Sequence, residues 1–146
     1  MHKQIKAMYP GSFDPIHAGH LDIIKRCCKI FDKLYVVVSV NIYKNNLRTI
    51  QTRLNNVKKA IQKLHLKNVV VVANKKLITT FAKKNGISII VRGIRNMKDV
   101  SYEINISRAN YMLNKSIETM FILPRKKLAT TSSTAIRYYH DAMRMK

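Results

Sequence analysis

The sequence has few cysteines, few acidic residues and no long apolar run, and each shortage excludes a class of protein. Its two cysteines, Cys27 and Cys28, are neighbours, so they cannot build the disulfide framework of a small secreted domain. The longest apolar runs have about five residues, whereas a membrane-spanning helix needs about 20. Apolar residues nevertheless make up 47% of the 146 residues, which excludes global disorder. We expect a cytoplasmic protein, without membrane contact, that forms a single domain over residues 1–146.

The scarcity of acidic residues makes the chain strongly basic. Seven Asp and Glu stand against 28 Lys and Arg, which gives a formal net charge of +21 and a pI near 10.3. Such an excess is typical of nucleic-acid-binding proteins, but here the lysine pairs are scattered along the chain and form no basic tail. Lysine, isoleucine and asparagine also share A/T-rich codons, so compositional drift is an alternative explanation. We therefore expect no specific nucleic-acid partner, although the positive field would attract phosphorylated small molecules.

Only four glycines and three prolines interrupt the chain, and between them short apolar runs alternate with helical patterns. Residues 5–9, 34–40, 69–73, 88–91 and 118–123 are almost continuously apolar, as in parallel strands covered on both faces. Helical spacing recurs from about residue 20, from residue 54, and over 77–85, 99–113 and 133–143, with Gly86 as the expected C-cap of the third helix. This alternation predicts an α/β fold, a Rossmann-like doubly wound domain with a five-stranded parallel sheet. Ligands of such sheets bind beyond the carboxyl ends of the strands.

The loop after the first strand, residues 9–20, combines glycines, prolines and two histidines. Gly11 allows the backbone to approach a ligand closely, and the helix that begins near His20 offers free N–H groups to an anion. His17 and His20 are three residues apart and would share one face of a helical turn. A metal pair, core packing and a phosphate contact are all compatible with that spacing. Since Asp14 is the only carboxylate nearby, phosphate is favoured and no metal ligand is expected.

Arginines follow the fourth strand. Arg92 and Arg95 flank Gly93 where that strand is expected to end, and a guanidinium grips phosphate with two parallel hydrogen bonds. The alternative is a pair of surface ion pairs with Asp99 or Glu103. Taken alone, the motif therefore indicates an anion site with only moderate specificity.

Two more loops leave the same edge of the predicted sheet. Lys44 follows the second strand, and residues 130–134 are five consecutive hydroxyl residues at the start of the last helix. These hydroxyls would either cap the helix or form a second phosphate cradle. Together the loops predict a site that binds several phosphates without a protein nucleophile, which suits nucleotidyl transfer.

Three motifs connect the sequence to a known family. Residues 17–20, His-Ala-Gly-His, resemble the (T/H)-x-G-H signature of the nucleotidyltransferase superfamily. Two further motifs narrow the resemblance: residues 9–15 read Tyr-Pro-Gly-Ser-Phe-Asp-Pro, and residues 92–103 read R-G-x-R-x3-D-x2-Y-E. With all three motifs, the chain closely resembles bacterial phosphopantetheine adenylyltransferases from residue 6 to about residue 137. The resemblance implies adenylyl transfer from ATP to 4′-phosphopantetheine, with release of dephospho-coenzyme A and pyrophosphate in coenzyme A synthesis. It also implies Mg²⁺ carried on the ATP phosphates.

The same resemblance implies roles for individual residues. His20, Lys44, Arg92 and Ser12 would be catalytic. Ser12, Lys44 and Arg92 would also bind phosphopantetheine, with Ile78 along its pantetheine arm. The residues 128–134 depart from the family pattern, because an aromatic and a central aliphatic residue are replaced. The residues implied to bind ATP are Ser12, Phe13, His20, Gly93, Ile94, Arg95, Glu103, Leu128, Ala129, Thr130, Thr131, Ser132, Ser133 and Thr134.

Assembly and rival functions complete the expectations. Members of the family form hexamers of two trimers, and residues 102–113 carry more apolar side chains than one helix face requires, so we expect a homo-oligomer. One rival function is a sister nucleotidyltransferase that acts on nicotinate mononucleotide or an alcohol phosphate. The other is an inactive nucleotide- or RNA-binding domain.

Overall fold

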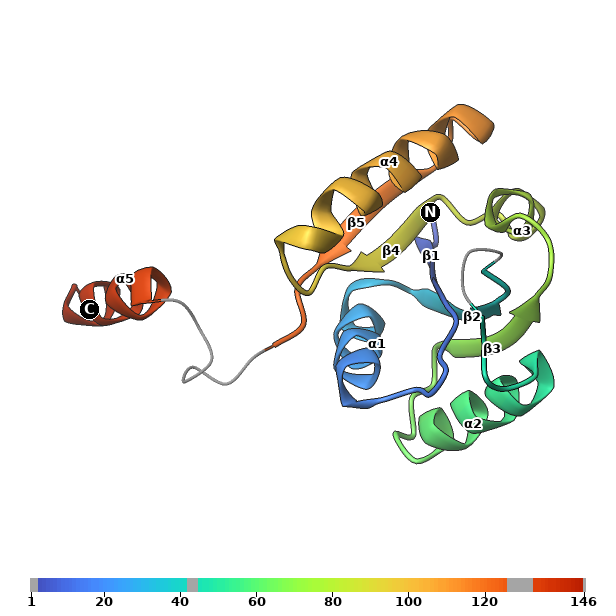
Figure 1. The fold of residues 1–146 in the computed structure, drawn as a ribbon, viewed down its shortest axis with the longest axis horizontal. Coiled ribbons are helices and arrows are strands. Elements are labelled where there is room, and N and C mark those ends of the chain that lie inside the picture. Colours follow the sequence, from blue (N-terminus) through green and yellow to red (C-terminus); the bar gives the residue numbers. More distant parts are fainter. Residues whose placement is uncertain (1–2, 42–44, 126–132, 146) are drawn as a thin grey trace.

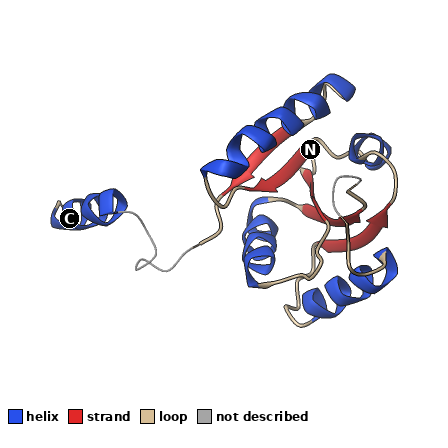
Figure 2. Ribbon diagram, in the orientation of Figure 1, coloured by secondary structure: helices blue, strands red, loops and turns tan. Residues whose placement is uncertain are grey.

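The computed structural model describes residues 3–41, 45–125 and 133–145 of the chain. Strands and helices alternate along it, as the sequence pattern predicts (Figures 1 and 2). The elements in chain order are β1 (Lys6–Gly11), α1 (Ala18–Ile30), β2 (Lys33–Ser39), α2 (Ile50–Gln62), β3 (Val69–Asn74), α3 (Ile78–Asn85), β4 (Ile89–Gly93), α4 (Met97–Leu113), β5 (Glu118–Ile122) and α5 (Ser133–Arg144).

The five strands form one parallel sheet in the order β3-β2-β1-β4-β5, which confirms the predicted fold class. The chain builds outward from β1 to β3 and then returns across the sheet to start β4 on the other side of β1. β1 pairs with β2 over six residues, but with β4 only at Ala7↔Ile89 and Met8↔Ile90. Beyond Met8 the two central strands therefore separate, and space opens at their carboxyl ends, where ligands of such sheets bind.

Two apolar layers cover the sheet, because successive side chains of a strand point to opposite faces. On one face, Val36 and Val38 of β2 pack with α1 and α2 around Ile24 and Val57. On the other face, a second cluster joins the sheet to α3 and includes the fully buried Met8. In Figure 1, α1 and α2 lie together on one side of the sheet, and α3 and α4 lie on the other. Burial on both faces explains the continuous apolar runs of the central strands.

Several element boundaries differ from those expected. β1 and β4 are longer at their carboxyl ends, so Arg92 and Gly93 belong to β4 and not to the loop that follows it. α1 begins at Ala18, two residues earlier than expected, because His17 caps it. α4 likewise begins at Met97, where Asn96 provides the cap. Gly86 is confirmed as the C-cap of α3, with a left-handed φ of 65°.

The two cysteines lie on α1 and serve packing. Cys27 is fully buried in the first apolar layer, and Cys28 is half-buried beside it. Burial raises the pKa of the Cys27 thiol to about 12 and that of Cys28 to about 11. Both thiols are therefore protonated near neutral pH and are poor nucleophiles.

The last helix, α5, follows residues 126–132 and lies apart from the sheet in Figure 1. Within the described part of the chain, none of the helices combines the length and the apolar content needed to cross a bilayer.

Candidate active site

A cavity of about 570 Å³ occupies the carboxyl edge of the sheet, where β1 and β4 separate. Its wall comes from the β1–α1 loop, the end of β2 and the loop after it, β4, α4 and Pro124. The structure thus brings together parts of the chain more than 100 residues apart. The predicted site residues that line the cavity are Ser12, Phe13, His20, Arg92, Gly93, Arg95 and Glu103.

Phe13 anchors the β1–α1 loop beneath the cavity. Its ring is buried and meets the rings of Tyr9 and His20 edge-on, with centroids 5.5 Å and 5.0 Å away. Its backbone takes a positive φ of 47°, which is uncommon for a bulky residue and needs support from its surroundings. A Cβ on Gly11 would lie 3.0 Å from the Phe13 ring, so Gly11 permits this close approach.

The two histidines form a capping arrangement at the start of α1. The Gly19 N–H donates to His17 Nδ1 at 3.1 Å, and the His17 N–H donates to His20 Nδ1 at 3.2 Å. The two rings stack with centroids 3.7 Å apart. Because each Nδ1 accepts a hydrogen bond, the neutral rings carry their proton on Nε2. The predicted shared face is therefore present, but the capping role of His17 was not predicted.

Arg92 is held by Glu103 in a bidentate ion pair. Arg92 Nε donates to Glu103 Oε2 at 2.7 Å, and Nη2 donates to Oε1 at 2.8 Å. Burial alone would lower the pKa of Arg92, but the hydrogen bonds and charge of Glu103 raise it. The ion pair that the sequence offered as an alternative thus exists, although it lies in the cavity wall and not on the outer surface. It fixes the plane of the guanidinium beside the cavity.

Arg95 is more exposed to solvent than Arg92. Its side chain is 68% exposed and forms an ion pair with Asp99 at 3.2 Å. Hydrogen bonds from the backbone and side chain of Arg95 lower the pKa of Asp99. An exposed pair of this kind contributes little stability, so an incoming phosphate can take over the guanidinium at small cost.

The second carboxylate of the cavity, Asp14, is also paired with an arginine. Arg48 binds it through Nη1 at 2.8 Å and through its backbone N–H at 3.2 Å, and the side-chain hydrogen bond lowers the pKa of Asp14. Among the described residues, moreover, no three potential metal ligands gather in one place. The two described carboxylates that line the cavity, Asp14 and Glu103, are therefore both engaged by arginines.

Comparison with known proteins identifies the family. The Cytidylyltransferase-like family matches residues 8–138. A phosphopantetheine adenylyltransferase of Nautilia profundicola is 40% identical over 132 residues, which cover 90% of this chain and 84% of that protein. Another from Finegoldia magna is 42% identical over 132 residues, covering 90% and 80% of the two chains. The chain belongs to the phosphopantetheine adenylyltransferase family.

A solved structure shares the fold of this member of the family. The lipopolysaccharide core biosynthesis protein of Thermoplasma volcanium aligns with a TM-score of 0.58, over 86% of this chain and 99% of its own. At 22% sequence identity, this likeness concerns the fold alone.

Of the other described residues that the family resemblance implies, Ile78, Ile94 and Thr134 do not line the cavity. Ile78, at the start of α3, packs against the second apolar layer. Ile94 follows Gly93 and donates its N–H to the Ile122 carbonyl at 3.0 Å. Ser133 begins α5, and Thr134 is exposed on it. The calls on Lys44, Leu128, Ala129, Thr130, Thr131 and Ser132 lie outside the described residues.

Sequence reasoning missed two arginines that support the adenylyltransferase site. Arg48 holds Asp14, and Arg53 is buried on α2 beneath the β1–α1 loop. A signal for Arg53 exists in the sequence, because it stands four residues before Val57 and eight before Ile61, on the buried stripe of the helix. A charged residue in such a stripe requires polar partners.

Proposed function

We propose that the protein transfers the adenylyl group of ATP to 4′-phosphopantetheine, giving dephospho-coenzyme A and pyrophosphate. One observation carries this proposal: in this member of the family, a single cavity is lined by the N-terminus of α1 with His20, by Ser12, and by the two arginines Arg92 and Arg95. Both carboxylates of the cavity are already paired with arginines, so its remaining donors suit two anionic substrates. We also propose that the reaction takes place in the cytoplasm, as expected from the sequence.

The proposed step is a direct displacement. A phosphate oxygen of phosphopantetheine forms a bond to the α-phosphorus of ATP while the bond from that phosphorus to the pyrophosphate oxygen breaks. The attacking oxygen is already ionised, so the protein needs to supply neither a nucleophile nor a general base. His20 would donate its Nε2–H to an oxygen of the α-phosphate, where negative charge develops, and the N-terminus of α1 adds its positive dipole end.

The remaining residues would bind and orient the substrates. Ser12, Lys44 and Arg92 would hold the phosphate of phosphopantetheine, with Glu103 keeping Arg92 in place. Gly93 and Arg95, with residues 128–134, would contact ATP, and Mg²⁺ bound to ATP would offset the charge of its phosphates.

The test is pyrophosphate release from ATP and phosphopantetheine by the wild type, by His20→Ala and by His65→Asn. His20→Ala removes one hydrogen-bond donor to the charge that develops on the α-phosphate. It should lower kcat about 100-fold or more, with a smaller change in KM. His65→Asn is the matched control, because His65 is exposed in the turn after α2 and its positive φ of 51° is compatible with asparagine.

Two outcomes would overturn the proposal. Turnover of nicotinate mononucleotide in place of phosphopantetheine would identify a sister nucleotidyltransferase. A folded wild type that releases no pyrophosphate would favour the inactive binding domain, and RNA binding with a steep salt dependence would then mark incidental electrostatics.

We further propose that α4 and β5 pack against other copies of the chain in a homo-oligomer, a hexamer by family resemblance. Apolar side chains on this edge are exposed, among them Met97 (82%), Met112 (79%) and Leu113 (60%) on α4, and Phe121 (38%) on β5. Sedimentation of the wild type beside Met112→Lys tests it. A monomeric wild type would contradict this proposal.

A further inference from the structure

Arg53 is a buried cation directly behind the proposed active site. It lies on α2, and only 2% of its surface is exposed. Among the described residues no carboxylate forms an ion pair with it. Burying a charge in this way is unfavourable unless its hydrogen bonds are satisfied, so its partners reveal what the residue does.

Those partners are three main-chain carbonyls from separate segments. Nη1 donates to the Ser12 carbonyl at 2.6 Å and to the Ser39 carbonyl at 3.0 Å, and Nε donates to the Arg48 carbonyl at 3.3 Å. Ser12 belongs to the β1–α1 loop, Ser39 ends β2, and Arg48 precedes α2. One guanidinium thus joins the loops that follow the two neighbouring strands β1 and β2.

The bond to Ser12 also determines the orientation of the next N–H. A trans peptide is planar, and its N–H points opposite to its C=O. The Ser12 carbonyl points to Arg53, so the N–H of Phe13 points away from α2. Among the described residues, no atom accepts a hydrogen bond from that N–H. Phe13 lines the cavity, so a ligand there could accept it.

We propose that Arg53 is a positioning residue: it orients the Ser12–Phe13 peptide so that the Phe13 N–H faces the cavity and donates to a phosphate of ATP. This inference rests on the proposed adenylyl transfer. Lysine cannot replace arginine here, because a single ammonium group does not have the rigid fork that reaches three separate carbonyls. Without the fork, the strained φ of Phe13 relaxes and the N–H turns out of place.

The test combines kinetics with the amide NMR signal of Phe13. In the wild type, titration with ATP should shift that signal. In Arg53→Lys the shift should be lost, and kcat/KM for ATP should fall about tenfold or more, the effect of one hydrogen bond to a charged group. Since the NMR readout needs no turnover, it stays informative even if the wild type fails to use phosphopantetheine.

Asn68→Ala is the matched control for lost stability. Asn68 also joins two main-chain carbonyls, those of Cys28 and Phe31, both at 2.9 Å, but at the opposite edge of the sheet. This variant should lose stability and keep the Phe13 shift and the KM for ATP.

Arg53→Lys with wild-type kinetics and a wild-type Phe13 shift would overturn the proposal. So would a Phe13 signal that ATP leaves unmoved in the wild type, a result that can be obtained even if Arg53→Lys does not fold.

Discussion

The ring of Phe13 couples the backbone at Gly11 to the position of His20. A methyl group on Gly11 would lie 3.0 Å from that ring, which is itself buried and in contact with the His20 ring. We expect Gly11→Ala to push the ring aside, to reduce the free energy of unfolding by about 1–3 kcal/mol and to lower kcat. Thermal unfolding and pyrophosphate release measure the two effects.

The control for Gly11→Ala uses the ring itself. Because leucine is smaller than phenylalanine, Gly11→Ala should cost less stability in a Phe13→Leu background than in the wild type. An equal cost in both backgrounds would show that the overlap with the ring is not the cause.

Tyr9 makes the free energy of unfolding depend on pH in the alkaline range. Burial raises the pKa of its hydroxyl above the ordinary value of 10.0. The unfolded chain ionises first, so the stabilisation from a neutral Tyr9 is complete below pH 10 and is lost as the pH rises above it. We expect Tyr9→Phe to lose less of its free energy of unfolding than the wild type between about pH 8 and pH 11, as measured by urea denaturation. A parallel loss in both proteins would contradict this expectation.

A contact between two residues is easier to predict from the sequence when the two residues are close together in the chain. His17 and His20 are close in the chain, so their shared face could be predicted. Arg92 on β4 and Glu103 on α4 are 11 residues apart in the chain, so the sequence offers Glu103 and Asp99 as alternative partners, and only the packing of α4 decides between them. Arg53 was overlooked because the helical pattern was recognised from apolar residues alone, while its acceptors are carbonyls of other segments.

The first turn of α1 depends on one side chain, that of His17, for both its cap and the support of His20. The His17 side chain accepts the N–H of Gly19, and its backbone holds His20 through Nδ1. We expect His17→Ala to cost about 1 kcal/mol of stability through loss of the cap. It should also lower kcat, because the stacked support of His20 is lost.

His17→Ser separates the two contributions. Serine caps a helix well but cannot stack, so it should restore the thermal stability and leave part of the loss in kcat. If His17→Ser and His17→Ala lose equal stability, the cap is not what His17 contributes.

The end of a helix or strand can be predicted where nearby residues in the chain determine it, but not where pairing with a distant strand determines it. The end of α3 follows from Gly86, whose left-handed φ is a backbone property of that residue. The carboxyl ends of β1 and β4 were placed too early, because Pro10 and Arg92 look like loop residues in the sequence. In the structure, parallel pairing to β2 and to β5 extends both strands, so that Pro10 is buried and Arg92 is half-buried.

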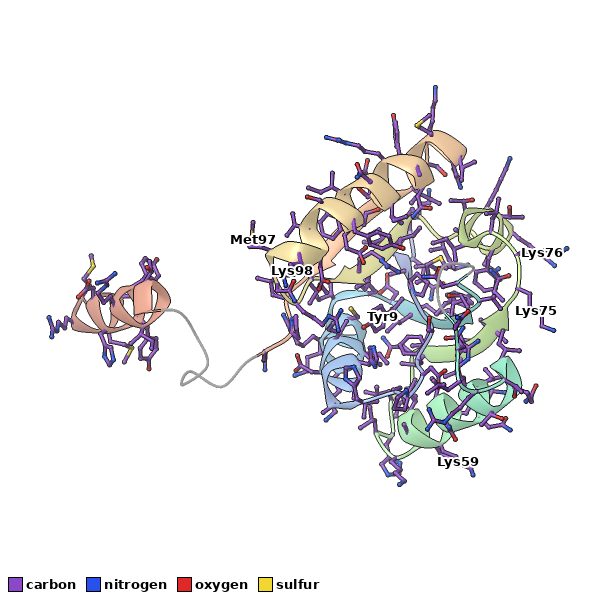
Figure 3. The ribbon with its side chains drawn as sticks, in the orientation of Figure 1. Tyr9, Lys59, Lys75, Lys76, Met97 and Lys98 are labelled. Carbon is purple, nitrogen blue, oxygen red and sulfur yellow. The ribbon has the colours of Figure 1, made fainter. Side chains whose placement is uncertain are left out.

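At the scale of the whole molecule, the formal net charge of +21 makes the protein a strong polycation. Figure 3 shows Lys59, Lys75 and Lys76 extending outward from α2 and from the segment after β3, far from Tyr9 at the centre. A broad positive field attracts anionic substrates, and salt screens it. We expect KM for ATP and for phosphopantetheine to rise severalfold between about 0.05 and 0.5 M KCl, with little change in kcat.

Two lysines far from the cavity provide the control for the salt effect. Lys75→Gln combined with Lys76→Gln removes two of the charges without touching the cavity wall, so KM should change less than about twofold. A fall in kcat with constant KM across the salt range would contradict an effect of the overall field.

The central place of β1 in the sheet affects how the protein forms on the ribosome. β1 is made before the other four strands. β2 can pair with it, and β3 with β2, as soon as they emerge, but the other edge of β1 waits for β4, about 80 residues later. Until then the nascent chain displays an unpaired strand edge, which is open to wrong pairing. The same delay means that Arg92, Gly93 and Glu103 reach the cavity late, so the half-made protein holds one wall of its active site and not the other.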